Sequence, residues 1–233
     1  MTGRPIATWQ RIDREDLIRH VQRSRKRPGL YPIVGRDIDG REVAANLVAE
    51  VLEIDFALRV IRIPQRNEAS PRHLLCDAWA AVHGPVDDHD IPPWVSTRTF
   101  ITVPEVCSRI SARLGSRKDT AFVFDTVDYE QGIKASGVKI FETLALDVGA
   151  PVYVASRRES GTRWRNSSPF PLKKMHVTDA RATLQPVRSM LGLSLDDIDS
   201  IEAMLASSAD RGKIGARDMY DVVSAHLLGS AVT

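Results

Sequence analysis

From about residue 58 onward, short apolar runs alternate with amphipathic stretches, and this alternation limits the fold more than any other feature. The runs "RVIRI" (59–63), "TRTFITV" (97–103), "TAFVFD" (120–125) and "PVYVAS" (151–156) are rich in β-branched and aromatic residues. The stretches between them have helical periodicity. Strands that alternate with helices form parallel sheets, and near-continuous apolar strands are covered on both faces. The sequence therefore predicts an α/β, doubly wound (Rossmann-like) fold with a mainly parallel sheet of about four strands.

Helices are predicted to flank this core at both ends of the chain. At the N-terminus, Asp13 can cap a first helix that ends at Pro28-Gly29, and a second helix runs from about residue 41 to 56. At the C-terminus, Ser194 and Asp197 have the spacing of a capping box. We therefore expect a helical N-terminal segment at 1–57, an α/β core at 58–178 and a helical C-terminal segment at 179–233, packed on the core.

Overall charge and hydropathy exclude several classes of protein. The chain has 32 Lys and Arg against 30 Asp and Glu, so no global field draws it onto nucleic acid or a membrane. The basic run "RHVQRSRKR" (19–27) is a local exception, and we interpret it as a solvated helix face or a phosphate contact. No long apolar span and no signal peptide is found, which favours a cytoplasmic protein. Cys76 and Cys107 lie in apolar-periodic stretches, which predicts two buried thiols.

Three carboxylates follow the apolar run at 120–124, namely Asp125, Asp128 and Glu130. Ligands of open parallel sheets bind beyond the carboxyl ends of the strands. Carboxylates at such an end are partly solvated, so their charge costs less there than in the core. The sequence thus predicts a core strand whose tip faces a binding crevice, or a polar loop that caps the next helix.

A second candidate site lies at the start of a helix that Ser70 can cap. Pro71 stands at its first position and Gly84 follows its end. Backbone N–H groups with the nearby Arg72 guanidinium make a phosphate-binding arrangement. Plain capping with surface charges is the alternative.

The segment 124–156 resembles nucleoside 2-deoxyribosyltransferase-like proteins and their relatives among nucleotide N-glycosidases. The matching features are a strand that ends in Asp125, Asp128, the small-residue turn Ser136-Gly137, Glu142 on the next helix, and the Gly-x-Pro-Val sequence at 149–152. The resemblance implies a nucleoside or nucleotide substrate, with Ser136 and Gly137 in the substrate-binding turn.

The same resemblance implies cleavage or transfer of an N-glycosidic bond by paired carboxylates. Glu142 would attack or stabilise the sugar carbon, and Asp125 or Asp128 would hold or protonate the base. Two close carboxylates push their pKa values apart, so that one serves as acid and the other as base. The alternative for Glu142 is a charge on a helix surface.

Several other chemistries lack a motif. Walker, GxGxxG and GxSxG motifs are absent, so we expect neither ATP hydrolysis nor dinucleotide redox chemistry, and no cofactor. His89 stands among three aspartates in a turn, which we interpret as solvated, so no metal site is expected.

The competing hypothesis is a non-enzymatic Rossmann-like module whose helical ends engage a protein partner or nucleic acid. Apolar stripes on the C-terminal helices support a protein partner or a homo-oligomer. Nucleic acid is not expected but stays open, and no membrane partner is expected.

Overall fold

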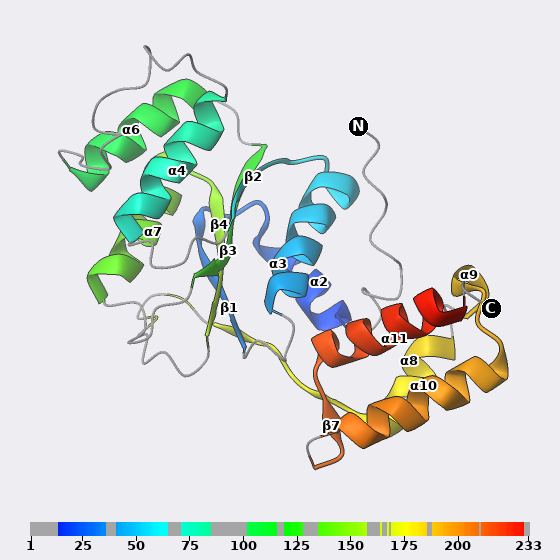
Figure 1. Cartoon of the computed structure of the whole chain (residues 1–233). Helices are drawn as coiled ribbons and strands as arrows, with labels where there is room; N and C mark the ends of the chain where they lie inside the picture. The colour runs from blue at the N-terminus through cyan, green and yellow to red at the C-terminus, as the bar shows by residue number, and fades with distance from the viewer. Residues whose placement is uncertain are drawn as a thin grey trace.

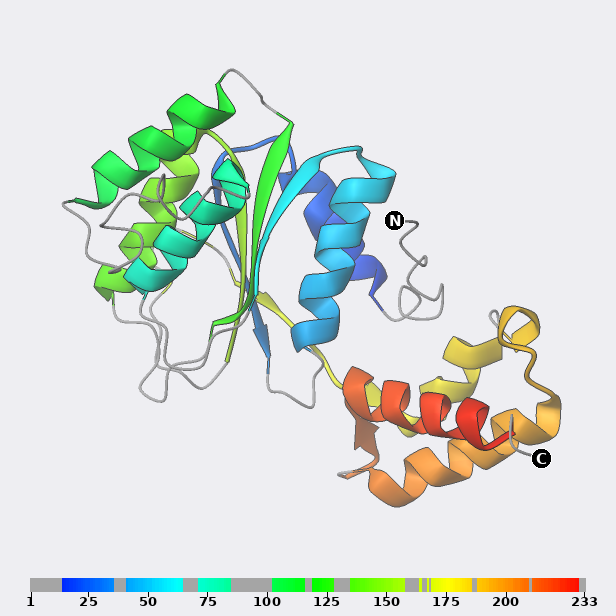
Figure 2. The same cartoon turned by 45° about the horizontal axis from the view of Figure 1, so that its top comes forward.

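The computed structural model describes residues 14–35, 41–64, 71–84, 102–115, 119–127, 135–157, 164, 167, 169–185, 188–209 and 211–230. Its larger part is an α/β core, and its smaller part is a helical unit at the C-terminal end of the chain (Figure 1). Figure 2 shows the helical unit beside the side of the sheet that carries α2 and α3.

A five-stranded parallel sheet forms the centre of the core, with strand order β2-β3-β4-β1-β5. The strands are β1 (Gly29–Gly35), β2 (Arg59–Ile63), β3 (Thr120–Val127), β4 (Pro151–Arg157) and β5 (Phe170–Pro171). This parallel sheet with its flanking helices confirms the predicted fold class. It has one strand more than expected, because β1 and β5 join it and the run at 97–103 is not among the described strands.

The prediction of a wholly helical N-terminal segment is wrong at β1. This strand pairs with β4 along its whole length, from Gly29 beside Pro151 to Gly35 beside Arg157. Its sequence, "GLYPIVG", carries a proline in the middle, a residue that argues against a central strand. The strand tolerates Pro32 because β5 pairs only with Ile33 and Val34, so one flank is open at the proline. The first strand of the sheet therefore lies inside the segment expected to be helical.

Helices cover both faces of the sheet. One face carries α2 (Glu15–Ser24), α3 (Arg41–Glu50) and a π-helical continuation, η2 (Val51–Asp55). The other face carries α4 (Pro71–His83), α6 (Val103–Leu114) and α7 (Ala135–Val148). Figure 1 shows the two layers on opposite sides of the strands.

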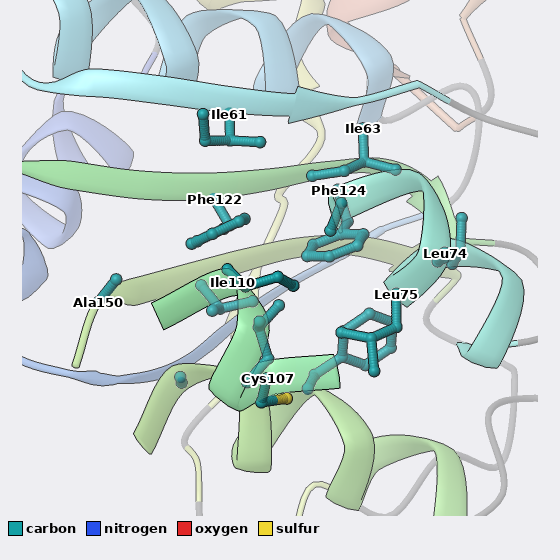
Figure 3. Packing of buried hydrophobic residues seen from close by; sticks show 14 of the residues in the cluster. Ile61, Ile63, Leu74, Leu75, Cys107, Ile110, Phe122, Phe124 and Ala150 are labelled. Atoms are coloured by element: carbon teal, nitrogen blue, oxygen red, sulfur yellow. The ribbon is translucent and has the colours of Figure 1, made fainter. Parts of the chain in front are cut away.

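Side chains along β3 point alternately into the two layers of the core. Phe122 and Phe124 pack against α4, α6 and α7 (Figure 3), and the Phe124 ring meets that of Phe141 at 4.9 Å. Ala121 and Val123 face α3 instead. Side chains of successive strand residues point to opposite faces, so residue 125 continues on the α3 side.

The helix boundaries follow the capping signals. α4 begins at Pro71 and ends before Gly84, whose φ is +79°, as predicted. α6 begins at Val103, inside the run expected to form a strand, because the Thr102 side chain accepts a hydrogen bond from the Glu105 backbone N–H at 3.3 Å. Thr102 and Val103 are therefore not strand residues, and the rest of the run expected to form a strand, 97–101, lies outside the described residues.

The helical unit consists of four helices and a two-stranded ribbon. Its elements are β6 (Met175–His176), α8 (Val177–Leu184), α9 (Arg188–Leu191), α10 (Leu195–Ser208), β7 (Lys213–Ile214) and α11 (Ala216–Ser230). β6 pairs with β7, so the unit begins a few residues before the expected boundary at 179. The side chains of Ile201, Leu205 and Val223, all 0% exposed, belong to its own apolar core.

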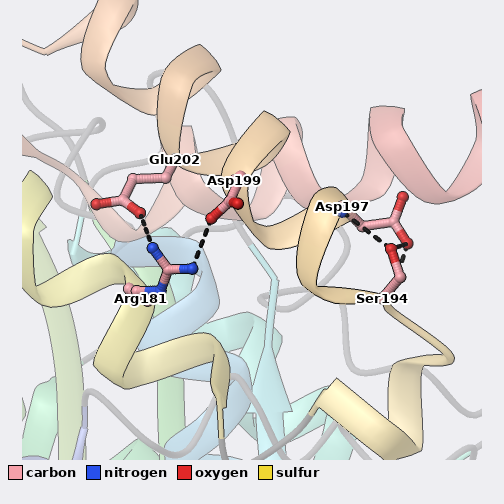
Figure 4. A network of polar contacts seen from close by, with 5 residues as sticks. All are labelled: Arg181, Ser194, Asp197, Asp199 and Glu202. Carbon is pink, nitrogen blue, oxygen red and sulfur yellow. Dashed lines mark hydrogen bonds and ion pairs between the residues drawn. The ribbon is translucent and has the colours of Figure 1, made fainter.

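Polar side-chain contacts in this unit cap the start of α10 and link α8 to α10 (Figure 4). Ser194 and Asp197 form the predicted capping box at the start of α10. The Arg181 guanidinium on α8 reaches Asp199 at 2.6 Å and Glu202 at 3.5 Å, and so links α8 to α10. None of the helices in the described part of the chain is long and apolar enough to span a membrane.

Candidate functional site at the carboxyl edge of the sheet

The carboxyl ends of the parallel strands meet at one edge, where open α/β sheets bind their ligands. Gly35 ends β1, Asp125 lies near the end of β3, and Ser156 lies near the end of β4. β4 runs between the other two strands. The connection from β1 leads to α3 on one face, whereas the connection from β3 leads to α7 on the other. Between β1 and β3, the connections that leave the carboxyl ends of the strands therefore turn to opposite faces of the sheet. Ligands of such sheets usually bind at this point.

Asp125 lies on the α3 side of this edge. It lines a small cavity of about 170 Å³ together with Asn46 and Ala49 of α3 and Arg62 of β2. The Arg62 guanidinium is within 3.2 Å of the Glu53 carboxylate and 3.5 Å of the Asn46 side-chain oxygen. Asp125 therefore lies in a corner between β2, β3 and α3 that Asn46 and Arg62 also reach.

Glu142 lies on the other side of the sheet. It is half-buried on α7, and its Oε1 atom is buried with no hydrogen-bond partner among the described residues. The sheet separates α7 from the cavity that Asp125 lines. The pair of Glu142 and Asp125 expected from the resemblance is therefore not formed. The third carboxylate, Asp128, lies outside the described residues.

The four residues proposed to bind substrate are only partly described. Ser136 and Gly137 lie in the first turn of α7, where Gly137 is buried and the Ser136 side chain is not described. Arg72 lies in the first turn of α4, and its side chain is not described either. Ser70 and the acidic turn around His89 are outside the described residues. Within the described part of the chain, no group of three His, Cys, Asp or Glu side chains is placed to hold a metal ion.

The connection from β1 to α3 is a candidate site that was missed in the sequence. Its residues 35–42 read "GRDIDGRE", a G-x-x-x-x-G-R-E pattern. The phosphate-binding loop G-x-x-x-x-G-K-[ST] has the same glycine spacing and the same place between a strand and a helix. Arg41 stands where that loop has lysine, and Glu42 where it has Ser or Thr. In the sequence, the glycine spacing is the one sign of such a loop. The spacing indicates a phosphate-binding loop only when a strand precedes it, and Gly29–Gly35 was not expected to be a strand.

Arg41 occupies the first position of α3 and is 1% exposed. The N-terminal turn of a helix presents backbone N–H donors and the positive end of the helix dipole. A guanidinium held there adds a fixed positive charge. This end of α3 is therefore suited to an anionic group.

Gly35 also has a purely structural reason to be glycine. A Cβ atom at this position would lie 2.9 Å from both Cβ and Cδ1 of Leu172, which follows β5. The Leu172 N–H also donates to the Val34 carbonyl at 2.7 Å. Close packing of β5 on β1 thus explains the first glycine of the pattern without any ligand.

Ser156 contributes a polar group beside the end of β1. It pairs in register with Val34 and is 0% exposed. Its hydroxyl has no hydrogen-bond partner among the residues that the structure describes. Buried hydroxyls nearly always have a partner, so this hydroxyl is a candidate for contact with a group bound at the edge.

Comparisons with known proteins give structural neighbours only. No family model matches the chain, and no curated protein matches its sequence. The Aeropyrum pernix Orc1 protein, solved in complex with DNA, is similar with a TM-score of 0.56 and 17% identity over 94% of this chain and 61% of that chain. A chain of the HORMA:CdnC:Trip13 complex of Escherichia coli MS115-1 aligns with a TM-score of 0.41 and 10% identity, over 93% of this chain and 83% of that chain. The chain thus spans about three fifths of the length of Orc1 and shares its fold.

Proposed function

We propose that this protein binds the phosphate groups of a nucleotide at the junction of β1 and α3. The observation that carries the proposal is the spacing of Gly35, Gly40 and Arg41 between a parallel strand and the start of a helix. A loop of this spacing brings backbone N–H groups toward an anion, and the helix dipole favours negative charge at the same point.

Arg41 is the residue that we expect to contact the phosphates. A guanidinium binds phosphate through two parallel N–H donors and keeps its charge even when buried. It can therefore replace the lysine of a conventional phosphate-binding loop, although it is bulkier and its fork is rigid.

Two further residues bear on whether a bound nucleotide would be hydrolysed, and they act in opposite directions. Asp125 offers the carboxylate oxygen that a magnesium ion on nucleotide phosphates takes. Glu42, however, replaces the hydroxyl that normally ligates this ion, and its negative charge would repel the phosphates. The residues of this chain therefore suit a nucleotide-binding scaffold better than a fast nucleotidase.

Nucleotide titration of purified variants tests the proposal. Arg41→Ala should weaken binding of a nucleoside triphosphate by about tenfold or more, since a hydrogen bond to a charged group contributes roughly 1.5–3 kcal/mol. Arg41→Lys, which restores the conventional residue, should retain binding. Arg217→Ala on the exposed surface of α11 is the matched control, and circular dichroism checks that each variant is folded. Equal affinity in Arg41→Ala and the parent protein would exclude this site.

N-glycosidic bond cleavage remains a second candidate function. The observation that favours it is the buried Oε1 atom of Glu142, which lacks a hydrogen-bond partner among the described residues. Asp128 would have to supply the second carboxylate, because Asp125 faces the other side of the sheet. Release of free base from a panel of nucleosides and nucleotides, abolished by Glu142→Gln, would support this candidate, and no release by the folded protein would remove it.

A further inference from the structure

A basic groove lies where the chain passes from the α/β core to the helical unit. Its volume is about 580 Å³. One wall is α2, the floor is β5, and the other wall is the segment from Lys173 to Asp179, which includes β6 and the start of α8. Gly35 and Arg41 are not among its lining residues, so this groove is distinct from the proposed nucleotide site.

The groove concentrates positive charge in a protein that is nearly neutral. Five Lys and Arg side chains line it against two carboxylates, although the whole chain carries a net charge of only +2. The cations are Arg14, Arg19, Arg23, Lys173 and Lys174. The two lysines are about 150 positions away from the arginines, so only the fold brings the two groups together. Clefts lined by charge of one sign focus the field and attract oppositely charged partners.

Two of these five cations have no ion-pair partner within the described part of the chain. Asp16 is engaged by Arg19, whose guanidinium lies 2.6 Å from its carboxylate. Within the described part of the chain, neither Arg23 nor Lys173 forms an ion pair, and both side chains are exposed. Two cations on opposite walls are therefore available to an anionic partner.

Ring surfaces lie between the charged walls. Phe170 is half-buried in the groove, and its ring centroid lies 5.2 Å from that of His20. Burial and the nearby Arg23 charge lower the pKa of His20, which favours its neutral ring. Phosphate-binding cations beside aromatic rings are the combination on which single-stranded nucleic acids bind.

The positive charge continues past the groove along α2. Lys26 and Arg27 follow the end of this helix and are exposed. Exposed cations beyond the lining residues favour an extended phosphate backbone over a compact anion.

We propose that this groove binds a single strand of nucleic acid, with its phosphates on Arg23 and Lys173 and its bases toward Phe170. Because the two walls belong to the core and to the helical unit, a bound strand bridges them. The proposal does not depend on nucleotide binding at the β1–α3 junction.

Fluorescence anisotropy with a labelled 20-nucleotide single strand, as DNA and as RNA, tests this proposal on the full chain. The double variant Arg23→Glu/Lys173→Glu should weaken binding by about tenfold or more, because it reverses two phosphate contacts. The matched control is Arg113→Glu/Lys139→Glu, which reverses two exposed charges on α6 and α7, across the sheet from α2. The control should bind like the parent protein.

Salt dependence gives a second, independent readout. Each phosphate contact to a single strand contributes about −0.7 to the slope of log affinity against log salt concentration. The groove double variant should therefore have a slope closer to zero by about 1.4. Parent-like affinity and slope in this variant would overturn the proposal, as would equal weakening by the control. Preference for inorganic triphosphate, or for a duplex of the same length, would overturn it as well.

Discussion

Gly35 illustrates how one residue can serve packing and a binding site at once. Its missing side chain leaves room for Leu172, and the same residue opens the G-x-x-x-x-G pattern. A glycine in such a pattern is therefore no proof of a ligand. The charge of Arg41, whose side chain is buried at the start of α3, is the better evidence for phosphate binding.

Gly35→Ala should destabilise the fold by about 1–3 kcal/mol, the usual cost of overpacking. The added Cβ would lie 2.9 Å from two Leu172 carbon atoms. Urea unfolding of Gly35→Ala, Leu172→Ala and the double variant measures the coupling. The double variant should lose less stability than the sum of the two single changes, since removing the leucine relieves the clash. Strict additivity would show that the contact imposes no strain.

Both cysteine thiols should be unreactive in the folded protein. Cys76 and Cys107 are 1% and 0% exposed, which confirms the sequence-based prediction of burial. Burial raises the pKa of Cys76 to about 11 and that of Cys107 to about 12. Because the thiolate is the reactive form, a disulfide reagent at pH 8 should label two thiols per chain in denaturant and none in buffer. Rapid labelling of the native protein would contradict the buried positions.

At the scale of single elements, the sequence predicts best what is encoded locally. The capping box at Ser194 and the start of α4 at Pro71 depend on neighbours within a few residues, and both are found where expected. β1 was missed because its strand character depends on pairing with β4, more than 100 positions later, which overrides the unfavourable Pro32. Which face of the sheet a side chain lies on also depends on distant parts of the chain. The separation of Asp125 from Glu142 therefore could not be predicted.

The capping box should make the helical unit sensitive to acid. Hydrogen bonds from the Ser194 hydroxyl and backbone N–H, and then from His226, lower the pKa of Asp197 to about 2. The folded pKa is below the unfolded value of 3.8, so the ionised carboxylate stabilises the fold above that value. This contribution should be lost as the pH falls from about 4 toward 2.

Thermal unfolding of Asp197→Asn across this pH range checks the prediction. The variant should be less stable than the parent protein at pH 6, and the difference should shrink toward pH 2. Asp221→Asn on the exposed surface of α11 is the control. A difference that is independent of pH would show that the charge of Asp197 does not contribute.

Apolar packing, and not the Arg181 network, should hold the helical unit together. Ile201 is fully buried, and Ile201→Ala should cost roughly 2–5 kcal/mol. Arg181→Ala should cost less than about 1 kcal/mol, because its two ion pairs lie on the surface. Chemical denaturation of the two variants ranks these effects. A larger loss for Arg181→Ala would mean that the ion pairs dominate.

For the whole molecule, the alternation of strands and helices was sufficient to predict a parallel α/β fold. It did not predict the strand order, because β1 is inserted between β4 and β5 and its sequence pattern is weak. The order decides where ligands bind, since it sets the point at which connections leave to opposite faces. Asp125 lies near the carboxyl end of β3, as expected, but the first strand and α3 carry the stronger candidate site.

The similarity to Orc1 supports the same conclusion about architecture. At 17% identity it shows a shared fold and leaves the activity to be argued from the residues of this chain. From those residues we propose two separate anion-binding surfaces, one at the start of α3 and one in the groove between α2 and Lys173.

Backbone amide NMR of the isotope-labelled protein during titration with a nucleoside triphosphate tests the central claim most directly. Phosphates bound at the junction of β1 and α3 should shift the amides of residues 35–43 first and most strongly, with smaller changes near Asp125 and Ser156. Shifts confined to α2 and residues 173–176, or no saturable shifts at all, would contradict nucleotide binding at the β1–α3 junction.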